Sequence, residues 1–342
     1  MERKLLLRNG AFRPWAIAAM LLLPPLIAVF CCGFGRMSLP PAKLIETAFL
    51  TLTGRDADPQ ARAVIFELRI PRILMAIAVG GGLGCAGAAC QALFSNPLAT
   101  PDILGVTSGT CVGAILAILL SFNMAGIQAT ALLFGLFSVF VTLRLSSGKR
   151  GISILFLVLS GVMISSLFNA LSSLLKYTAD PMDKLPQITY WLMGSFTGAS
   201  YRKLLIGSPM ILIGTALIYL LRWQFNILSL SEDEARASGI HLKRMRILLV
   251  LAITMITASS VSMCGQVGWV GLLIPHCARM MTGSNNRLVI PMSISLGASF
   301  LILIDTLSRT LTVIELPLSV LTAILGAPFF ILLLKRSERS FR

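Results

Sequence analysis

The sequence of 342 residues contains little charge, because only 13% of its residues are Asp, Glu, Lys or Arg. A soluble domain carries about 25%. Between Arg72 and Arg144 the only charged residue is Asp102, so the net charge of +15 does not come from a continuous basic face of the kind that binds nucleic acid. Hydrophobic residues make up 56% and mean hydropathy is +0.85, which predicts an all-α polytopic membrane protein.

The sequence also lacks the motifs of several kinds of site. It has seven cysteines and two histidines, without a CxxC pair or a spacing typical of zinc ligands, so we predict buried thiols and no metal site. No GxxxxGK[ST] motif is present, so ATP and Mg²⁺ would have to bind a separate chain. Neither a Ser/His/Asp set nor HExxH occurs, which argues against an enzyme. For His276, which follows Pro275, we expect a structural hydrogen bond to backbone freed by that proline.

Long apolar segments dominate the rest of the sequence. A helix needs about 20 apolar residues to cross the hydrocarbon layer. The apolar run 16–34 is long for a signal peptide and lacks a small-x-small cleavage site, so we interpret it as a retained span. We predict one membrane domain over 1–342 with ten spans, of which the fifth contains polar residues and the eighth is short: 14–34, 71–93, 103–121, 127–145, 152–175, 203–222, 246–264, 267–281, 288–307 and 317–334.

The distribution of basic residues predicts the orientation of these spans. An even number of spans places both termini on one side of the membrane, and that side carries 18 of the 29 Lys and Arg residues. Cytoplasmic loops are the ones enriched in Lys and Arg. We therefore expect both termini in the cytoplasm. Gly80, Gly84 and Ala88 follow a four-residue spacing that lets helix backbones approach closely.

Four segments differ from generic membrane sequence. They contain RIPR at 69–72 with NPLATPDILG at 96–105, the polar run 229–240, GQVGWVGLLIPHCAR at 265–279, and DTLSR at 305–309 with ELP at 315–317 and LGAPFF at 325–330. In this order they closely resemble the FecCD/BtuC-like permease subunits of ABC importers for iron–siderophore complexes, haem and vitamin B12. The resemblance extends from about Arg69 to the C-terminus.

The resemblance implies an architecture and a set of partners. It implies ten helices per subunit, in the bacterial cytoplasmic (inner) membrane and within the lipid bilayer, with a second permease copy or a paralogue across a central pathway. ABC ATPase subunits would bind the cytoplasmic face, and a soluble extracytoplasmic substrate-binding protein would dock outside. An iron–siderophore complex is the commonest cargo of this family, while haem, cobalamin or an oxyanion stay open.

The resemblance also assigns the cytoplasmic segment 229–242 to ATPase coupling. Ser231 can cap a short helix whose first turn is acidic, and Gly239 is placed to end it. Arg236 departs from the Glu-Ala-Ala pattern that is commoner among ABC permeases. The predicted coupling residues are Ser231, Glu232, Glu234, Arg236 and Gly239; an ordinary acidic loop is the alternative.

Three arginines are expected at the outer ends of spans two and nine. In similar importers, arginines at the positions of Arg69, Arg72 and Arg309 receive acidic residues of the binding protein. The alternatives are interfacial snorkelling and, for Arg309, an i,i+4 ion pair with Asp305.

Span five carries polar residues on one helical face, namely Ser165, Asn169, Ser172 and Lys176. A polar stripe within a bilayer must face protein or water. It therefore lines the pathway or, alternatively, supplies hydrogen bonds between helices. The inner end of this span, at Ser153, Ile154 and Leu155, is predicted to form a gate.

A secondary transporter coupled to an ion gradient is the alternative from another class. It would need ionisable residues within the membrane, and Asp305 and Lys176 are the only candidates. An intramembrane enzyme is less favoured, because no catalytic set is present.

Overall fold

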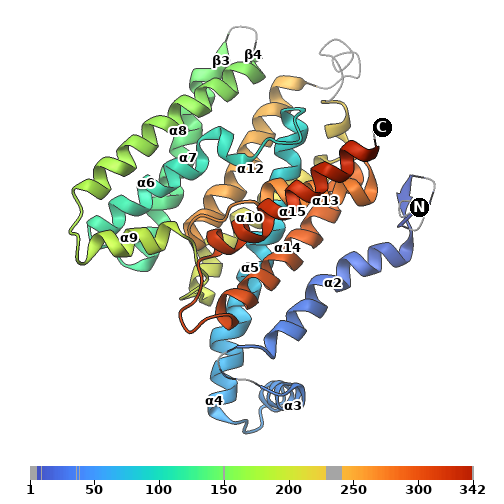
Figure 1. Ribbon diagram of the computed structural model, residues 1–342, viewed down its shortest axis with the longest axis vertical. Helices are drawn as coiled ribbons and strands as arrows, with labels where there is room; N and C mark the ends of the chain where they lie inside the picture. The colour runs from blue at the N-terminus through green and yellow to red at the C-terminus, as the bar shows by residue number, and fades with distance from the viewer. Residues whose placement is uncertain are drawn as a thin grey trace.

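The computed structural model describes residues 6–8, 10–35, 37, 39–148, 151–228 and 241–340. Helices make up nearly all of this part of the chain (Figure 1). Two short antiparallel hairpins accompany them, formed by β1 (Leu7–Arg8) with β2 (Ala11–Phe12) and by β3 (Ser147–Gly148) with β4 (Gly151–Ile152). The all-α prediction is therefore confirmed.

Each of the ten apolar segments expected from the sequence contains a helix. These are α2 (Pro14–Cys32), α5 (Ile70–Leu93), α6 (Val106–Leu119), α7 (Met124–Ser146), α8 (Ile154–Tyr177), α10 (Tyr201–Leu221), α12 (Leu242–Cys264), α13 (Val270–Thr282), α14 (Asn286–Thr310) and α15 (Leu318–Ser340). Within the described residues, seven helical segments are long and apolar enough to cross a membrane. The helices α6 and α13, with 14 and 13 residues, are too short to do so alone.

Helices α5 and α14 pack against each other at the centre of the bundle (Figure 1). A Cβ atom at Gly80 would lie closer than 3.0 Å to the carbonyl oxygen of Gly297, and one at Gly297 would lie as close to the carbonyl of Gly80. Gly84 approaches the Ser293 carbonyl in the same way, and Gly87 approaches Gly271 at the start of α13. The absence of side chains at this seam therefore sets the distance between the backbones.

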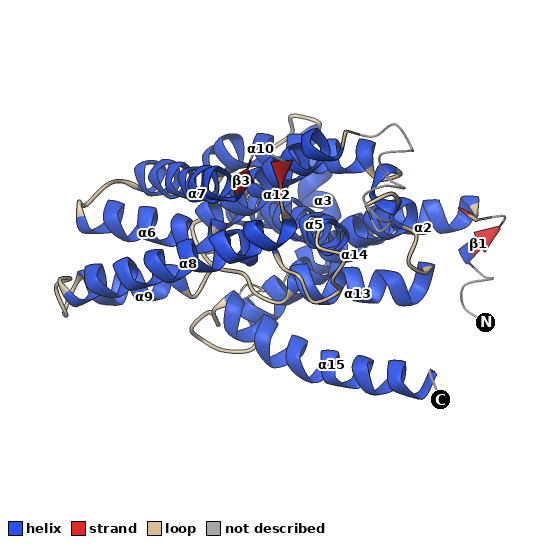
Figure 2. Ribbon diagram, turned by 90° about the horizontal axis from the view of Figure 1, so that it is seen from above, coloured by secondary structure: helices blue, strands red, loops and turns tan. Residues whose placement is uncertain are grey.

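Helix α2 lies at the edge of the bundle and contacts mainly α14 (Figures 1 and 2). It contains Pro24 and Pro25. A proline has no N–H, so Pro24 leaves the carbonyl of Met20, four residues earlier, without its helical donor. Ser295 of α14 supplies the missing donor through a hydrogen bond of 2.7 Å from its Oγ to the Met20 oxygen.

Short helices that we did not predict lie between the long ones. They are α3 (Pro41–Leu52), α4 (Pro59–Arg62), the π-helical turn η1 (Ala63–Arg69), the 3₁₀ turns η2 (Pro101–Leu104) and η3 (Gln224–Asn226), and α9 (Lys184–Leu192). Asp58 caps α4 and forms an ion pair of 2.8 Å with Lys43 of α3. The hydrogen bond from Lys43, together with that from the Gln60 amide, holds the pKa of the Asp58 carboxyl below its ordinary value. At its N-terminal end, α5 is continuous with η1 and α4.

We predict that Gly297→Ala destabilises the bundle by about 1–3 kcal/mol, because the added methyl group overlaps the Gly80 carbonyl. Thermal unfolding of the detergent-purified protein measures the change. Gly268→Ala is the matched control, since a Cβ at Gly268 meets no heavy atom within 4 Å. Equal unfolding temperatures for the two variants would contradict the close contact.

Candidate translocation pathway

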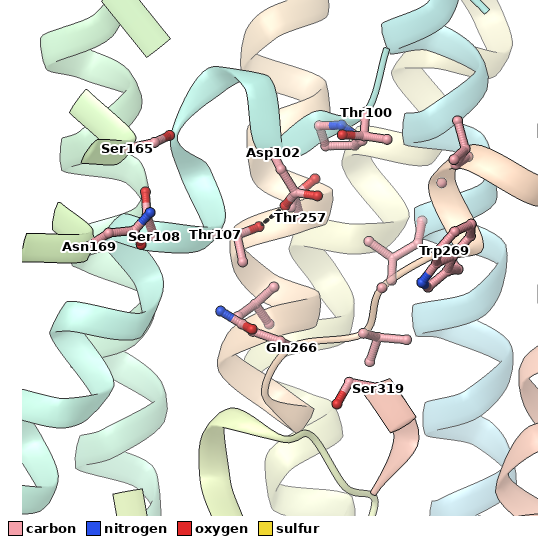
Figure 3. A pocket seen from close by; sticks show the side chains of 17 residues that line it. Thr100, Asp102, Thr107, Ser108, Ser165, Asn169, Thr257, Gln266, Trp269 and Ser319 are labelled. Carbon is pink, nitrogen blue, oxygen red and sulfur yellow. Dashed lines mark hydrogen bonds between the residues drawn. The ribbon is translucent and has the colours of Figure 1, made fainter. Parts of the chain in front are cut away.

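A cavity of about 470 Å³ lies between the helices of the bundle. Its walls come from α5, the segment that includes η2, α6, α8, α12, the loop 265–269, α13 and α15. Most of the polar side chains that line it are uncharged (Figure 3). They are Thr100, Thr107, Ser108, Ser165, Asn169, Thr257, Gln266 and Ser319, together with the acidic Asp102 and the indole of Trp269.

The segment after α5 forms the first wall through an irregular backbone. Asn96 accepts a hydrogen bond from the Leu98 amide, and Gly105 takes a left-handed conformation with φ of +80°. Irregular backbone at membrane depth requires partners within the protein. Ser138 of α7 donates to the Gly105 carbonyl at 2.6 Å, and Thr142 donates to the Leu104 carbonyl at 3.2 Å. These hydroxyls hold the segment in place, with Asp102 at the cavity and Thr107 donating to its carboxylate.

Trp269 lies in the loop 265–269 directly before α13, close to α15. Its φ of +68° is unusual for a non-glycine residue, and such strain is common at functional sites. A Cβ atom on Gly326 would lie 3.1 Å from the Trp269 Cβ, so the LGAPFF segment of α15 approaches the tryptophan closely. Trp269 and Asp102 were inside the quoted motifs, but their pattern alone did not assign them a place in a cavity.

Of the four polar residues of α8 that were predicted to line the pathway, only some line the cavity. Ser165 and Asn169 line the cavity (Figure 3). Ser172 is buried, and its Oγ has no hydrogen-bond partner within the described part of the chain. Lys176 is half-buried near the end of α8, outside the cavity lining. The geometry therefore brings only the first two of these residues together.

The predicted gate residues lie at the start of α8. Ser153 is the N-cap residue, and Ser153 and Leu155 are exposed. Ser153, Ile154 and Leu155 are not among the residues that line the cavity. The gate stays a prediction. The predicted coupling residues Ser231, Glu232, Glu234, Arg236 and Gly239 lie outside the described residues.

Arg69 and Arg309, which were expected to receive acidic residues of the binding protein, are buried in this chain, so docking at these two residues stays a prediction. Arg69 is 4% exposed and Arg309 is 8% exposed. Arg69 donates to the carbonyls of Cys32 and Met37, and Arg309 donates to those of Cys31 and Phe34, the latter at 2.7 Å. The last carbonyls of a helix have no intrahelical donor and carry partial negative charge. The two guanidinium groups therefore bind the C-terminal end of α2.

Arg72 is also engaged within the chain. Its Nε lies 2.7 Å from Asp305, and its terminal nitrogens bind both oxygens of Glu315 at 3.0 and 2.8 Å. Glu315 accepts a further hydrogen bond of 2.7 Å from Thr197. Asp305 also lies 3.6 Å from the Nε of Arg309, which is the i,i+4 ion pair considered from the sequence. This network joins α5, α14 and the loop that leads to α15.

His276 packs against an aromatic ring. Its ring lies edge-on to Phe330 of α15, with 5.5 Å between the ring centroids. Within the described part of the chain, no hydrogen bond joins His276 to the backbone near Pro275, so that detail of our expectation stays a prediction. Among the described residues, no group of three or more His, Cys, Asp or Glu side chains could hold a metal ion.

These features define a polytopic membrane protein with a polar cavity between its helices. Residues 22–336 match the model of the FecCD transport family. The chain belongs to the FecCD transport family, and its fold is that of a BtuC-like ABC importer permease. Membership confirms the resemblance, makes the chain a multi-pass inner-membrane transport subunit, and implies an ATPase partner and a permease dimer.

Several known proteins are similar over most of the chain. The molybdate import system permease protein MolB of Haemophilus influenzae is 38% identical, over 95% of this chain and 97% of MolB. A probable iron chelatin transport system permease protein of Helicobacter pylori is 37% identical, over 80% of this chain and 83% of the relative. A solved structure of a metal-chelate type ABC transporter in an inward-facing conformation is 38% identical, with a TM-score of 0.86, covering 95% of this chain and 100% of that chain.

We predict that Asp305→Ala destabilises the protein by about 3–5 kcal/mol, because Arg72 and Arg309 would lose a buried counter-charge. Thermal unfolding in detergent is the measurement. The control is Asp183→Ala, because the Asp183 carboxylate is 75% exposed and lies 3.7 Å from Lys184. Its loss should lower the free energy of unfolding by less than about 1 kcal/mol. An Asp305→Ala protein as stable as this control would show that the buried network contributes little.

Proposed function

We propose that this chain forms the membrane pathway of an ABC importer for a bulky metal chelate, most favourably an iron–siderophore complex, by alternating access. The observation that carries the proposal is the cavity lining. Its described lining residues include one carboxylate, Asp102, and no Lys or Arg. Such a surface suits a neutral or cationic chelate, whereas anion recognition favours charge-assisted donors.

The size of the cavity supports the same proposal. Sites for drug-sized molecules have volumes of about 300–1,000 Å³. The cavity of one chain has about 470 Å³, and a second permease copy across the pathway would add its own lining. This is more space than a small tetrahedral oxyanion requires. Haem and cobalamin would also be large enough, so size alone does not choose among the chelates.

Molybdate is a second candidate cargo, and one observation favours it. MolB, which is 38% identical to this chain over 97% of its own length, is named a molybdate import permease. The lack of a basic residue in the described cavity lining argues against molybdate here. An ion-coupled secondary transporter has no comparable support, because Asp305 is engaged with two arginines.

We also propose the partners and the orientation that the family resemblance implied. The excess of Lys and Arg on the side of the termini supports cytoplasmic termini. This orientation places segment 229–242 beside the ATPase. A substrate-binding protein would dock at the opposite end, where Val313 and Ile314 of the α14–α15 loop are 87% and 79% exposed. Arg69 and Arg309 would then hold the end of α2 in place below this docking surface. Arg72 would hold the α14–α15 loop in place through its ion pair with Glu315.

A transport assay tests the cargo. The permease is reconstituted with its ATPase and binding protein in proteoliposomes, which are supplied with an iron–hydroxamate siderophore complex or with molybdate. We expect ATP-dependent, vanadate-sensitive uptake of the iron chelate only, and a loss of up to about fivefold in Asp102→Asn, since one exposed charge contributes little. Asp180→Asn, which alters an exposed carboxylate outside the cavity lining, is the control. Uptake of molybdate alone would reverse the choice, and uptake driven by an ion gradient without ATP would reject the importer class.

A substitution at Gly239 tests the coupling segment. A β-branched residue is costly wherever the backbone needs a positive φ, so Gly239→Val should strain the end of the short helix. We expect ATPase activity to persist while transport falls at least tenfold. Gly10→Val is the control, because Gly10 also has a positive φ, of +75°, but lies outside the coupling segment and the cavity lining; we expect normal transport from it. Normal transport by Gly239→Val would remove the assignment of segment 229–242.

A further inference from the structure

A second, mostly apolar groove lies on the outside of the bundle between α2, α10 and α14, with a volume of about 650 Å³. Its walls include Ile17, Met20 and Leu21 of α2, and Leu288 and Ile294 of α14. Helix α2 is mostly exposed, and the groove follows the side of it that faces the bundle. The groove is separate from the polar cavity, because no residue lines both.

One end of this groove is basic. Arg222 and Arg287 both line it, and Arg222 lies over the ring of Tyr219 with its Cζ 3.8 Å from the ring centroid. Arg287 is exposed in the first turn of α14. Among the described residues, no carboxylate lies within ion-pair distance of either guanidinium group. This end of the groove therefore presents two positive charges in the described part of the molecule.

Aromatic residues mark the depth of that end in the membrane. Trp15 lies in the first turn of α2, Tyr219 lies in the last turn of α10, and Trp223 follows that helix; their exposed fractions are 51%, 40% and 54%. Exposed Trp and Tyr residues gather at the level of lipid headgroups. The arginines therefore lie at headgroup depth, and the apolar walls extend from them toward the acyl chains.

We propose that this groove binds one anionic phospholipid, with its phosphate on Arg222 and Arg287 and an acyl chain along α2. Guanidinium groups pair well with phosphate oxygens, and basic pockets between membrane helices bind anionic headgroups. Helices α2 and α14 contact each other directly, for example through the hydrogen bond from Ser295 to the Met20 carbonyl. The lipid would fill the groove that these two helices leave open beside those contacts. The proposal requires a membrane protein of this fold and does not depend on the cargo.

Native mass spectrometry of the purified permease without its ATPase tests the site. The protein is offered phosphatidylglycerol or phosphatidylcholine with the same acyl chains. We expect a preference for phosphatidylglycerol that falls about fivefold for each arginine removed, and so about 25-fold in the double variant Arg222→Gln, Arg287→Gln. The matched control is Arg144→Gln, because Arg144 also lies over an aromatic ring, 5.1 Å from Phe140, but outside the groove.

A second variant tests the apolar part of the groove. Ile17→Trp should reduce retention of both lipids, because Ile17 is 44% exposed and its replacement fills the groove with little effect on the core. Unchanged thermal unfolding confirms that each variant is folded. Equal retention of the two lipids by the wild type, or equal losses in Arg144→Gln and the double variant, would overturn the proposal. Displacement of the lipid by inorganic phosphate alone would also overturn it, because the site would then bind a free anion and not a phospholipid.

Discussion

The constraint on which this structure depends is that its backbone polar groups must find partners without water. Each unpaired group in hydrocarbon costs several kcal/mol. Ser295 supplies the donor that Pro24 removes, and Ser138 and Thr142 supply donors to the irregular segment before α6. The same need explains why two arginines bind the end of α2. At Pro24 and at the irregular turn before α6, the missing donors therefore come from hydroxyls of neighbouring helices.

This constraint changes the interpretation of Arg69, Arg72 and Arg309. Their position near helix ends agreed with docking of a partner, but their hydrogen bonds are to backbone of the same chain. Asp305 and Glu315 then balance the charge of Arg72. The carbonyls that Arg69 reaches are 32 and 37 residues away along the chain. Spacing within one helix could not have indicated such partners, although the i,i+4 pair of Asp305 and Arg309 was visible.

The hydropathy pattern predicted the helical fold and the positions of the ten long or buried helices, because each apolar run is continuous. It did not predict α3 or α9, which are short and amphipathic and lie between the long runs. The four-residue spacing of Ser165 and Asn169 placed both at the cavity, since one helical face points one way. Trp269 could not be predicted in the same way. Its place depends on a positive φ and on the absence of a side chain at Gly326, 57 residues later.

The short helix α13 connects the rigid centre of the bundle to the wall of the cavity. Gly271 at its start lies against Gly87 of α5, where a side chain on Gly87 would have no room, so the two helices are in direct backbone contact. Trp269, two residues earlier, contacts α15 at Gly326 and lines the cavity. The other end of α15 begins beside Met193 and Gly194, whose carbonyls accept hydrogen bonds from Ser319 and Leu318. A displacement of α15 relative to α5 would therefore change the contact between Gly326 and Trp269, and with it the part of the cavity wall that Trp269 forms.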